Sequence, residues 1–366
     1  MSLIEELEKA KQNINSDGYE MSIGELINLY RDGDIIISPA YQRLFRWEEW
    51  QQTSFIESLL IEIPTPPIFV HQDDSGTWEI IDGLQRTSTI LKFTGHLKDA
   101  DGQLLPATVL QGTKLAPSLN NKRWDAEDDS TGLGEDLKRS LKRTRIRVEI
   151  LKPGSGPKAK YELFQRLNTG GSPLSEQEVR NCVARMINPE FQDWLENCRI
   201  QDVFTSSMKL SDRSKSYQTD TELLIRFFAF RNIPYQSSLD VHEYLDNALI
   251  EMASNSQFPY ENEYDTFLQT FSFISSALGV NAFQKWNGTK FYGKFLLSAY
   301  EIITHCISFN IDKLSAMQES DRGLLIRDKV IELWNNPDFT KNSGMGISGK
   351  ARLSKLLPIA KKLINF

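Results

Sequence analysis

The chain has 366 residues, of which 40% are hydrophobic and 25% are charged, and its net charge is −7. This is ordinary globular composition, so a core of normal size needs no disulfide or metal to stabilise it, and the acidic balance argues against attraction of the whole surface to nucleic acid. The three cysteines, Cys182, Cys198 and Cys306, are far apart and show no CxxC spacing, which argues against a structural zinc site and favours a reducing compartment.

The N-terminal segment, residues 1–20, is expected to be helical. It begins with an acidic amphipathic pattern and lacks the basic start and apolar centre of a signal peptide. No apolar run in the chain approaches the roughly 20 residues that a membrane span needs. We therefore expect a cytoplasmic protein that does not associate with membranes.

Residues 21–185 show the pattern of a small domain of strands and helices. Ser22 and Glu25 have the spacing of a capping box for a helix that Gly33 ends. Further helices are expected at 47–61 and from Gly83 to Gly95, and strands at 34–37, 68–70, 78–81 and 146–151. The polar stretch 99–144 reads as a long loop or small insertion.

The rest of the chain is mostly helical in pattern. A helix is expected at 158–167, a glycine loop at 168–173, and a new helix that Ser175 opens. Helical periodicity then continues, for example at 223–230, 264–278, 291–307 and 324–334. The fold class is α+β, with a mixed-sheet domain over 21–185 and a helical domain over 186–366.

Two polar segments follow buried strands in the first domain. One is 41–47, with Gln42 and Arg43; the other is Asp82-Gly83-Leu84-Gln85-Arg86-Thr87. Gly83 permits a tight turn or the close approach of a ligand. The helix start behind it offers free N–H groups to an anion, and Arg86 adds a cation suited to phosphate. Such breaks in local pattern are where functional sites are expected.

A third polar segment, 164–181, repeats this logic with a glycine loop and a helix start. Its candidate binding residues are Asn168, Gly170, Gly171, Glu178, Arg180 and Asn181. Structural readings stay open for all three segments. Asp82-Gly83 alone is a common turn, Arg43 can pair with a nearby glutamate, and Glu178 has the spacing of a capping-box partner of Ser175. The residues do not say whether the phosphate belongs to a nucleotide or to DNA.

Two basic stretches stand out from the acidic background. One runs from Lys138 to Arg147, and the other from Lys341 to Lys362 without an acidic residue. Each is either a solvated helix face or a surface for a phosphate backbone.

The order of these blocks resembles the N-terminal domain of GmrSD-type restriction endonucleases, which are type IV, modification-dependent enzymes. The resemblance lies in Tyr41-Gln42-Arg43…Trp47, in 55–69, in Asp82-Gly83-Leu84-Gln85-Arg86 and in 164–181. It covers about residues 20–185 and implies a ParB/sulfiredoxin-like fold that binds nucleotides. Leu84 departs from the family's usual Asp-Gly-Gln-Gln-Arg box, which puts turnover in question more than binding.

The resemblance implies a nucleotide-binding protein, and an NTPase, that acts in DNA restriction and defence against phage. Asp82, Gln85 and Glu178 would be catalytic, and Asp82 and Glu178 would hold magnesium. The residues that would bind the nucleotide phosphates are Gln42, Arg43, Gly83, Arg86, Thr87, Asn168, Gly170, Gly171, Arg180 and Asn181.

Two alternatives remain from the sequence, a DNA-nicking endonuclease that uses the same pocket and a non-catalytic module that senses DNA or binds a partner. Relatives often carry a C-terminal HNH nuclease domain, but His242 and His305 do not stand in such a setting. We therefore expect partners among a nucleotide, DNA, a separately encoded nuclease subunit and a second copy of the chain in a homodimer.

Overall fold

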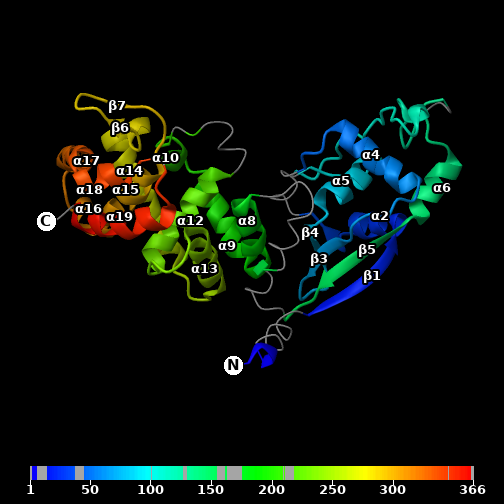
Figure 1. Cartoon of the computed structure of the whole chain (residues 1–366), viewed down its shortest axis with the longest axis horizontal. Coiled ribbons are helices and arrows are strands. Elements are labelled where there is room, and N and C mark those ends of the chain that lie inside the picture. Colours follow the sequence, from blue (N-terminus) through cyan, green and yellow to red (C-terminus); the bar gives the residue numbers. More distant parts are fainter. Residues whose placement is uncertain are drawn as a thin grey trace. The chain divides into compact units, whose positions relative to one another are not determined.

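The chain forms two compact units, Met1–Pro173 and Leu174–Phe366. The computed structural model (Figure 1) describes residues 2–5, 15–37, 45–99, 101–126, 130–154, 161–162, 175–208, 210, 218–344 and 346–363. The predicted boundary near residue 185 falls inside helix α8, Glu176–Ile187, which packs on α9 and α13 of the second unit. Each unit is described by itself.

A five-stranded mixed sheet forms the centre of the first unit, with the strand order β1-β5-β3-β4-β2. The pairs β1·β5 and β3·β4 are antiparallel, whereas β3·β5 and β2·β4 are parallel. The strands are β1 Ser16–Ser22, β2 Ile35–Ile36, β3 Ile68–Gln72, β4 Trp78–Asp82 and β5 Arg145–Leu151. The α+β class with a mixed sheet is thus confirmed.

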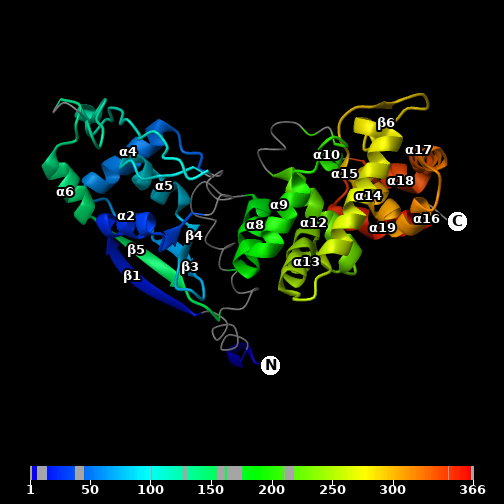
Figure 2. The same cartoon turned by 180° about the vertical axis from the view of Figure 1, so that it is seen from behind.

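The helices of the first unit lie on one face of this sheet (Figures 1 and 2). They are α2 Ile23–Asp32, α4 Glu49–Leu60, α5 Leu84–Phe93 and α6 Glu135–Arg143, with a 3-10 turn η1 at Pro117–Leu119. The side chain of Ser22 accepts a hydrogen bond from the N–H of Glu25, and Gly33 ends α2 in the left-handed conformation, as the sequence predicts. In β5, Ile146, Val148 and Ile150 are buried and alternate with more exposed residues.

The second unit is helical apart from a two-stranded hairpin of β6 and β7. Its core surrounds α12, whose residues Leu223–Phe230 are all buried and which packs on α8, α9, α13 and α15. The elements are α8 Glu176–Ile187, α9 Pro189–Arg199, α10 Asp202–Thr205, α12 Thr219–Asn232, α13 Val241–Ser254, α14 Tyr260–Leu278, η2 Gly279–Asn281, β6 Lys285–Trp286, β7 Phe291–Tyr292, α15 Leu297–Phe309, α16 Ile311–Ser315, α17 Glu319–Asn335, α18 Pro337–Asn342 and α19 Gly349–Leu363.

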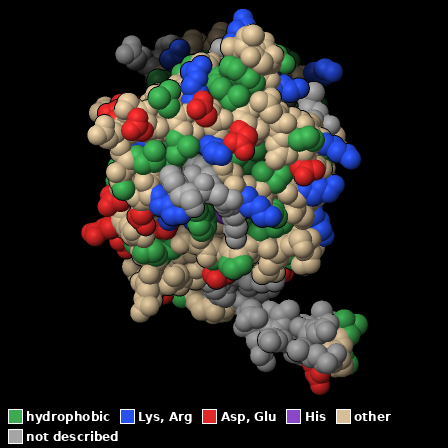
Figure 3. Space-filling model, turned by 90° about the vertical axis from the view of Figure 1, so that its left-hand side faces the viewer, with side chains coloured by type: hydrophobic (Ala, Val, Ile, Leu, Met, Phe, Trp, Pro, Cys, Tyr) green, Lys and Arg blue, Asp and Glu red, His purple; other side chains and the backbone are tan. Residues whose placement is uncertain are grey.

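The basic stretch 341–362 lies largely on α19, which turns an apolar face to this core. Leu353, Leu356 and Ala360 are fully buried. On the face of the unit shown in Figure 3, Lys and Arg side chains stand among acidic and apolar ones. The burial of Leu353, Leu356 and Ala360 fits the interpretation of this stretch as an amphipathic helix with a solvated basic face.

The structure corrects three predicted elements. Residues 16–22 form β1 rather than part of a helix, because they pair along their whole length with β5. Helix α6 lies inside the stretch expected to be a loop, 99–144. The helix expected at 291–307 begins only at Leu297, since Phe291–Tyr292 pair with Lys285–Trp286. The helix expected at 158–167 lies almost wholly outside the described residues.

Within the described parts of the chain, no helix combines the length and the apolar character that crossing a membrane requires.

Candidate functional site

The turn between β4 and α5 positions the first set of predicted residues. β4 ends at Asp82 and α5 begins at Leu84, so Gly83 alone connects them. Gly83 has φ 91° and ψ 14°, and a Cβ placed on it would lie 3.0 Å from Cγ1 of Ile68. Glycine suits both the left-handed backbone and the close approach. The start of α5 is therefore held tightly against β3.

The N-terminus of α5 has no side-chain cap among the described residues. The first helical hydrogen bond runs from the N–H of Thr87 to the carbonyl oxygen of Gly83, at 2.8 Å. Residues 84–86 precede it and supply the amides that a helix cannot satisfy internally. With the positive end of the helix dipole, these amides favour an anion at this position.

Arg86 crosses this turn and links it to the proline segment before β3. Its Nη2 donates to Oδ2 of Asp82 at 2.9 Å, and its Nη1 donates to the carbonyl oxygens of Pro66 and of Pro67, the latter at 3.1 Å. The side chain is 14% exposed. Burial lowers the pKa of Arg86, and the Asp82 carboxylate opposes this effect. Three of the five N–H donors of arginine are thus engaged by described residues.

Gln85 connects α5 to the segment that follows the predicted Gln42 and Arg43. Its Oε1 accepts hydrogen bonds from the backbone N–H groups of Arg46 at 3.0 Å and Trp47 at 3.1 Å. Trp47 in turn packs edge-to-face on Phe55 of α4, with ring centroids 5.6 Å apart. Gln85 therefore fixes residues 46–47 at the start of α5.

Thr87 is the last predicted residue of this turn that the structure describes. Its side chain is fully buried, and within the described residues its hydroxyl group has no hydrogen-bond partner. The remaining predicted residues of the first unit, Gln42, Arg43, Asn168, Gly170 and Gly171, lie outside the described residues.

The other predicted residues lie on α8, in the second unit. The backbone N–H of Ser175 donates to Oε2 of Glu178 at 2.7 Å, and the N–H of Glu178 donates to the Ser175 hydroxyl oxygen at 3.3 Å. This is the capping box that the sequence offered as one reading of Glu178. The Glu178 side chain is fully buried at the helix start.

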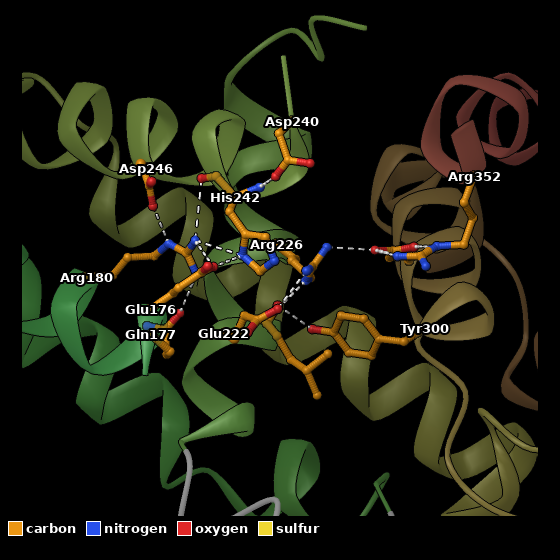
Figure 4. Close-up of polar contacts among 12 residues, drawn as sticks. Glu176, Gln177, Arg180, Glu222, Arg226, Asp240, His242, Asp246, Tyr300 and Arg352 are labelled. Atoms are coloured by element: carbon orange, nitrogen blue, oxygen red, sulfur yellow. Dashed lines mark hydrogen bonds and ion pairs between the residues drawn. The ribbon is translucent and has the colours of Figure 1, made fainter. Parts of the chain in front are cut away.

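Arg180 faces the interior of the helical unit (Figure 4). Its Nε donates to Oδ1 of Asp246 at 2.6 Å, and its Nη2 contacts Nδ1 of His242 at 3.2 Å. Gln177 and Glu176 complete its surroundings, at 3.4 and 3.6 Å. The side chain has no exposed surface. Arg180 therefore joins α8 to α13 through buried charge.

Asn181 lies beside Arg180 and is also satisfied within the second unit. Its Oδ1 accepts from Nε2 of Gln177 at 2.7 Å, and its Nδ2 donates to the side chain of Gln218. The structure thus brings Glu178, Arg180 and Asn181 together on α8, and it places Asp82 at the end of β4 beside Gln85, Arg86 and Thr87 at the start of α5; the two sets lie in different units.

Sequence reasoning missed a second ionic cluster, which Figure 4 shows beside Arg180. Arg226 of α12 donates to Glu222 and, at 2.8 Å, to Oε1 of Glu301, and Arg352 of α19 also donates to Glu301 at 2.9 Å. Burial raises the pKa of Glu222, but Arg226 beside it, together with the charges of Arg180 and His242, lowers it, and the pKa is lowered overall. A signal was present, since Arg226 interrupts the apolar run of α12.

No cluster of three or more His, Cys, Asp or Glu side chains suited to a metal ion occurs in the described parts of the chain. Asp82 belongs to the first unit and Glu178 to the second. Their joint role as magnesium ligands stays a prediction.

The comparisons with known proteins give one match. Residues 23–184 match the family model described as GmrSD restriction endonuclease, N-terminal domain. No curated protein and no solved structure matches the chain. The match begins at the first residue of α2 and ends inside α8, so it includes both sets of predicted residues.

Proposed function

Since residues 23–184 form a domain of the GmrSD restriction endonuclease N-terminal family, we propose that this domain binds a nucleoside triphosphate with magnesium and that the protein acts in DNA restriction. The observation that carries the proposal is the start of α5. There an uncapped helix end, a glycine turn and the guanidinium of Arg86 lie together. Each of these features favours a phosphate group.

The ligand's phosphate would contact the amides of residues 84–86 and the remaining donors of Arg86. Oδ2 of Asp82 accepts a hydrogen bond from Nη2 of Arg86 at 2.9 Å, so the guanidinium is oriented before a ligand arrives. Pre-orientation lowers the entropy that binding has to overcome. Asp82 is thus a positioning residue for Arg86.

Gln85 would act with Arg86 on the same ligand. Its Oε1 is engaged by the amides of residues 46 and 47, so we propose that it sets the position of that segment at the phosphate as well as that of an attacking water. Phosphoryl transfer needs mainly such positioning and the neutralisation of charge. A bound magnesium ion would supply part of that neutralisation.

Isothermal calorimetry of the full chain with ATP, GTP, CTP and UTP, each with and without magnesium, tests the proposal. We expect one or more of them to bind, and binding to weaken without the metal. An Arg31→Ala variant, which removes an exposed arginine elsewhere in the first unit, should bind as the unmodified protein does. Failure of all four triphosphates at millimolar concentration would refute the proposal.

A further inference from the structure

A second anion-binding feature lies in the first unit, away from the start of α5. A groove of about 730 Å³ is lined by Arg139 and Arg143 of α6 and by Arg145 and Arg147 of β5. All four side chains are exposed, and three of them have exposed fractions of 62%, 79% and 54% for Arg139, Arg145 and Arg147. Four arginines and three carboxylates line the groove, on a chain whose net charge is −7.

Local structure arranges these arginines in two pairs that line the groove. Arg139 and Arg143 are four residues apart on α6 and so share a helix face. Arg145 and Arg147 are two residues apart on β5 and so share a strand face, because Ile146 between them is buried. The close approach of Gly18 to Arg147, where an added Cβ would lie 2.6 Å from Nη2, leaves room for this guanidinium on the sheet.

The carboxylates around the groove engage its arginines to different degrees. Nε of Arg147 donates to Oε1 of Glu149 at 2.6 Å, so this guanidinium already has a close partner. Glu20, Glu62 and Asp136 also line the groove. Arg139 and Asp136 are 3.8 Å apart, and Arg145 and Glu20 are 3.9 Å apart. Exposed pairs of this length contribute little. Arg143 has no ion-pair partner among the residues that the structure describes.

The spacing of the arginines suits a repeating anion. The two on α6 are separated by about 5–6 Å, and the two on β5 by roughly 6.6 Å. Neighbouring phosphates of one nucleic acid strand have a similar separation. Each phosphate lies about 3.4 Å further along the helix axis than the one before it and is also rotated about that axis. A mononucleotide carries its phosphates in direct succession and cannot span both pairs in this way.

We propose that the groove between α6 and β5 binds the phosphate backbone of duplex DNA through Arg139, Arg143, Arg145 and Arg147. The exposed apolar side chain of Ile63, which also lines the groove, would face the sugars. These contacts carry no base information and so position the protein on DNA without reading sequence. The site is separate from the one proposed at the start of α5 and requires neither nucleotide nor magnesium.

Fluorescence anisotropy of the full chain with a labelled DNA duplex, without nucleotide and magnesium, tests this proposal. If the protein contacts four phosphates, the logarithm of the association constant should fall linearly with the logarithm of the salt concentration, with a slope of about −3.6. Arg143→Ala should make this slope shallower by about 0.9. The same variant should bind about three- to fivefold more weakly at fixed salt. Asp136→Asn removes a fully exposed carboxylate from the groove and should tighten binding.

Arg31→Ala is the matched control, because it removes an exposed arginine of the same unit outside the groove. It should change neither the affinity nor the slope. The proposal is overturned if Arg143→Ala and Arg145→Ala keep the slope of the unmodified protein, or if single-stranded or duplex RNA of equal length binds more tightly than DNA. A chain that binds DNA but no triphosphate would refute the nucleotide site alone.

Discussion

The starts of α5 and α8 each carry an arginine from the family match, but the two side chains lie in different surroundings. Arg86 is 14% exposed and has one carboxylate partner and two backbone carbonyls. Arg180 has no exposed surface and contacts Asp246, His242, Gln177 and Glu176. Among the described residues, three donors of Arg86 are engaged, whereas Arg180 is enclosed by side chains of its own unit.

The difference shows that two arginines within the residues that match the family model can have different surroundings. A guanidinium whose donors are partly used can hold phosphate. One that is fully enclosed and paired fixes the packing of its helix, because separating it from its carboxylate would leave a charge in a low-dielectric interior. From its place in the motif, Arg180 was predicted to bind phosphate. Its buried contacts favour a structural role in the second unit instead.

The largest effect is expected from Arg180→Ala. Removal of one partner of a buried ion pair leaves Asp246 uncompensated, which lowers the free energy of unfolding by about 3–5 kcal/mol. Urea denaturation measures this value. Arg185→Ala on the same helix, whose partner Asp193 is 72% exposed, should lower it by less than about 1 kcal/mol. A stable Arg180→Ala protein that no longer binds nucleotide would instead place Arg180 at the ligand.

Arg86→Ala should act chiefly on binding. A charge-assisted hydrogen bond contributes roughly 1.5–3 kcal/mol, so the affinity for the triphosphate should fall about ten- to a hundredfold. Some stability is lost too, because the contacts with Asp82, Pro66 and Pro67 disappear. Calorimetry and urea denaturation of the same sample separate the two effects. Unchanged affinity in a folded variant would limit Arg86 to holding the turn.

Local features of the fold could be predicted from the sequence because their causes are local. The cap of Ser22, the left-handed Gly33 and the Ser175–Glu178 box follow from residue spacing. The turn at Gly83 follows from a strand, a glycine and a helix in succession. Gln85, Arg86 and Thr87 lie side by side on α5 because they are consecutive in the sequence, and their role at a ligand stays a prediction.

Contacts between distant residues could not be predicted in this way. The partner of Arg180 is Asp246, 66 residues further along the chain. β1 was missed because its alternation is weak and its place depends on β5. Helix α6 was missed because its residues are mostly charged and only Leu141 is buried. A strand whose place depends on its pairing partner shows no clear periodic pattern in its own sequence. A helix with a single buried residue shows none either.

A comparison of Gly83→Ala with Gly76→Ala tests whether the close approach of Gly83 to Ile68 matters at the start of α5. Both glycines have nearly the same φ, 91° and 93°, so both variants suffer the same backbone strain of about 1–2 kcal/mol. Only at Gly83 would the new Cβ meet Ile68, at 3.0 Å. Urea denaturation should therefore show the greater loss for Gly83→Ala, and calorimetry should show lost triphosphate binding only there. Equal effects on stability and binding would mean that the close approach has no role.

The smallest structural effect is expected from Glu178→Gln, and this variant decides between two tasks for one side chain. Glutamine can also accept the hydrogen bond from the N–H of Ser175, so the capping box stays intact. Unfolding free energy and triphosphate affinity should therefore remain close to those of the unmodified protein.

If Glu178 positions water or a metal ion, loss of its charge should lower the hydrolysis rate by about a hundredfold, because that role acts mainly in the transition state. Glu190→Gln, at an exposed position of α9, controls for the loss of one negative charge in the second unit. Unchanged hydrolysis in Glu178→Gln would restrict Glu178 to capping α8, and Glu178 and Arg180 would then both serve the structure of the helical unit.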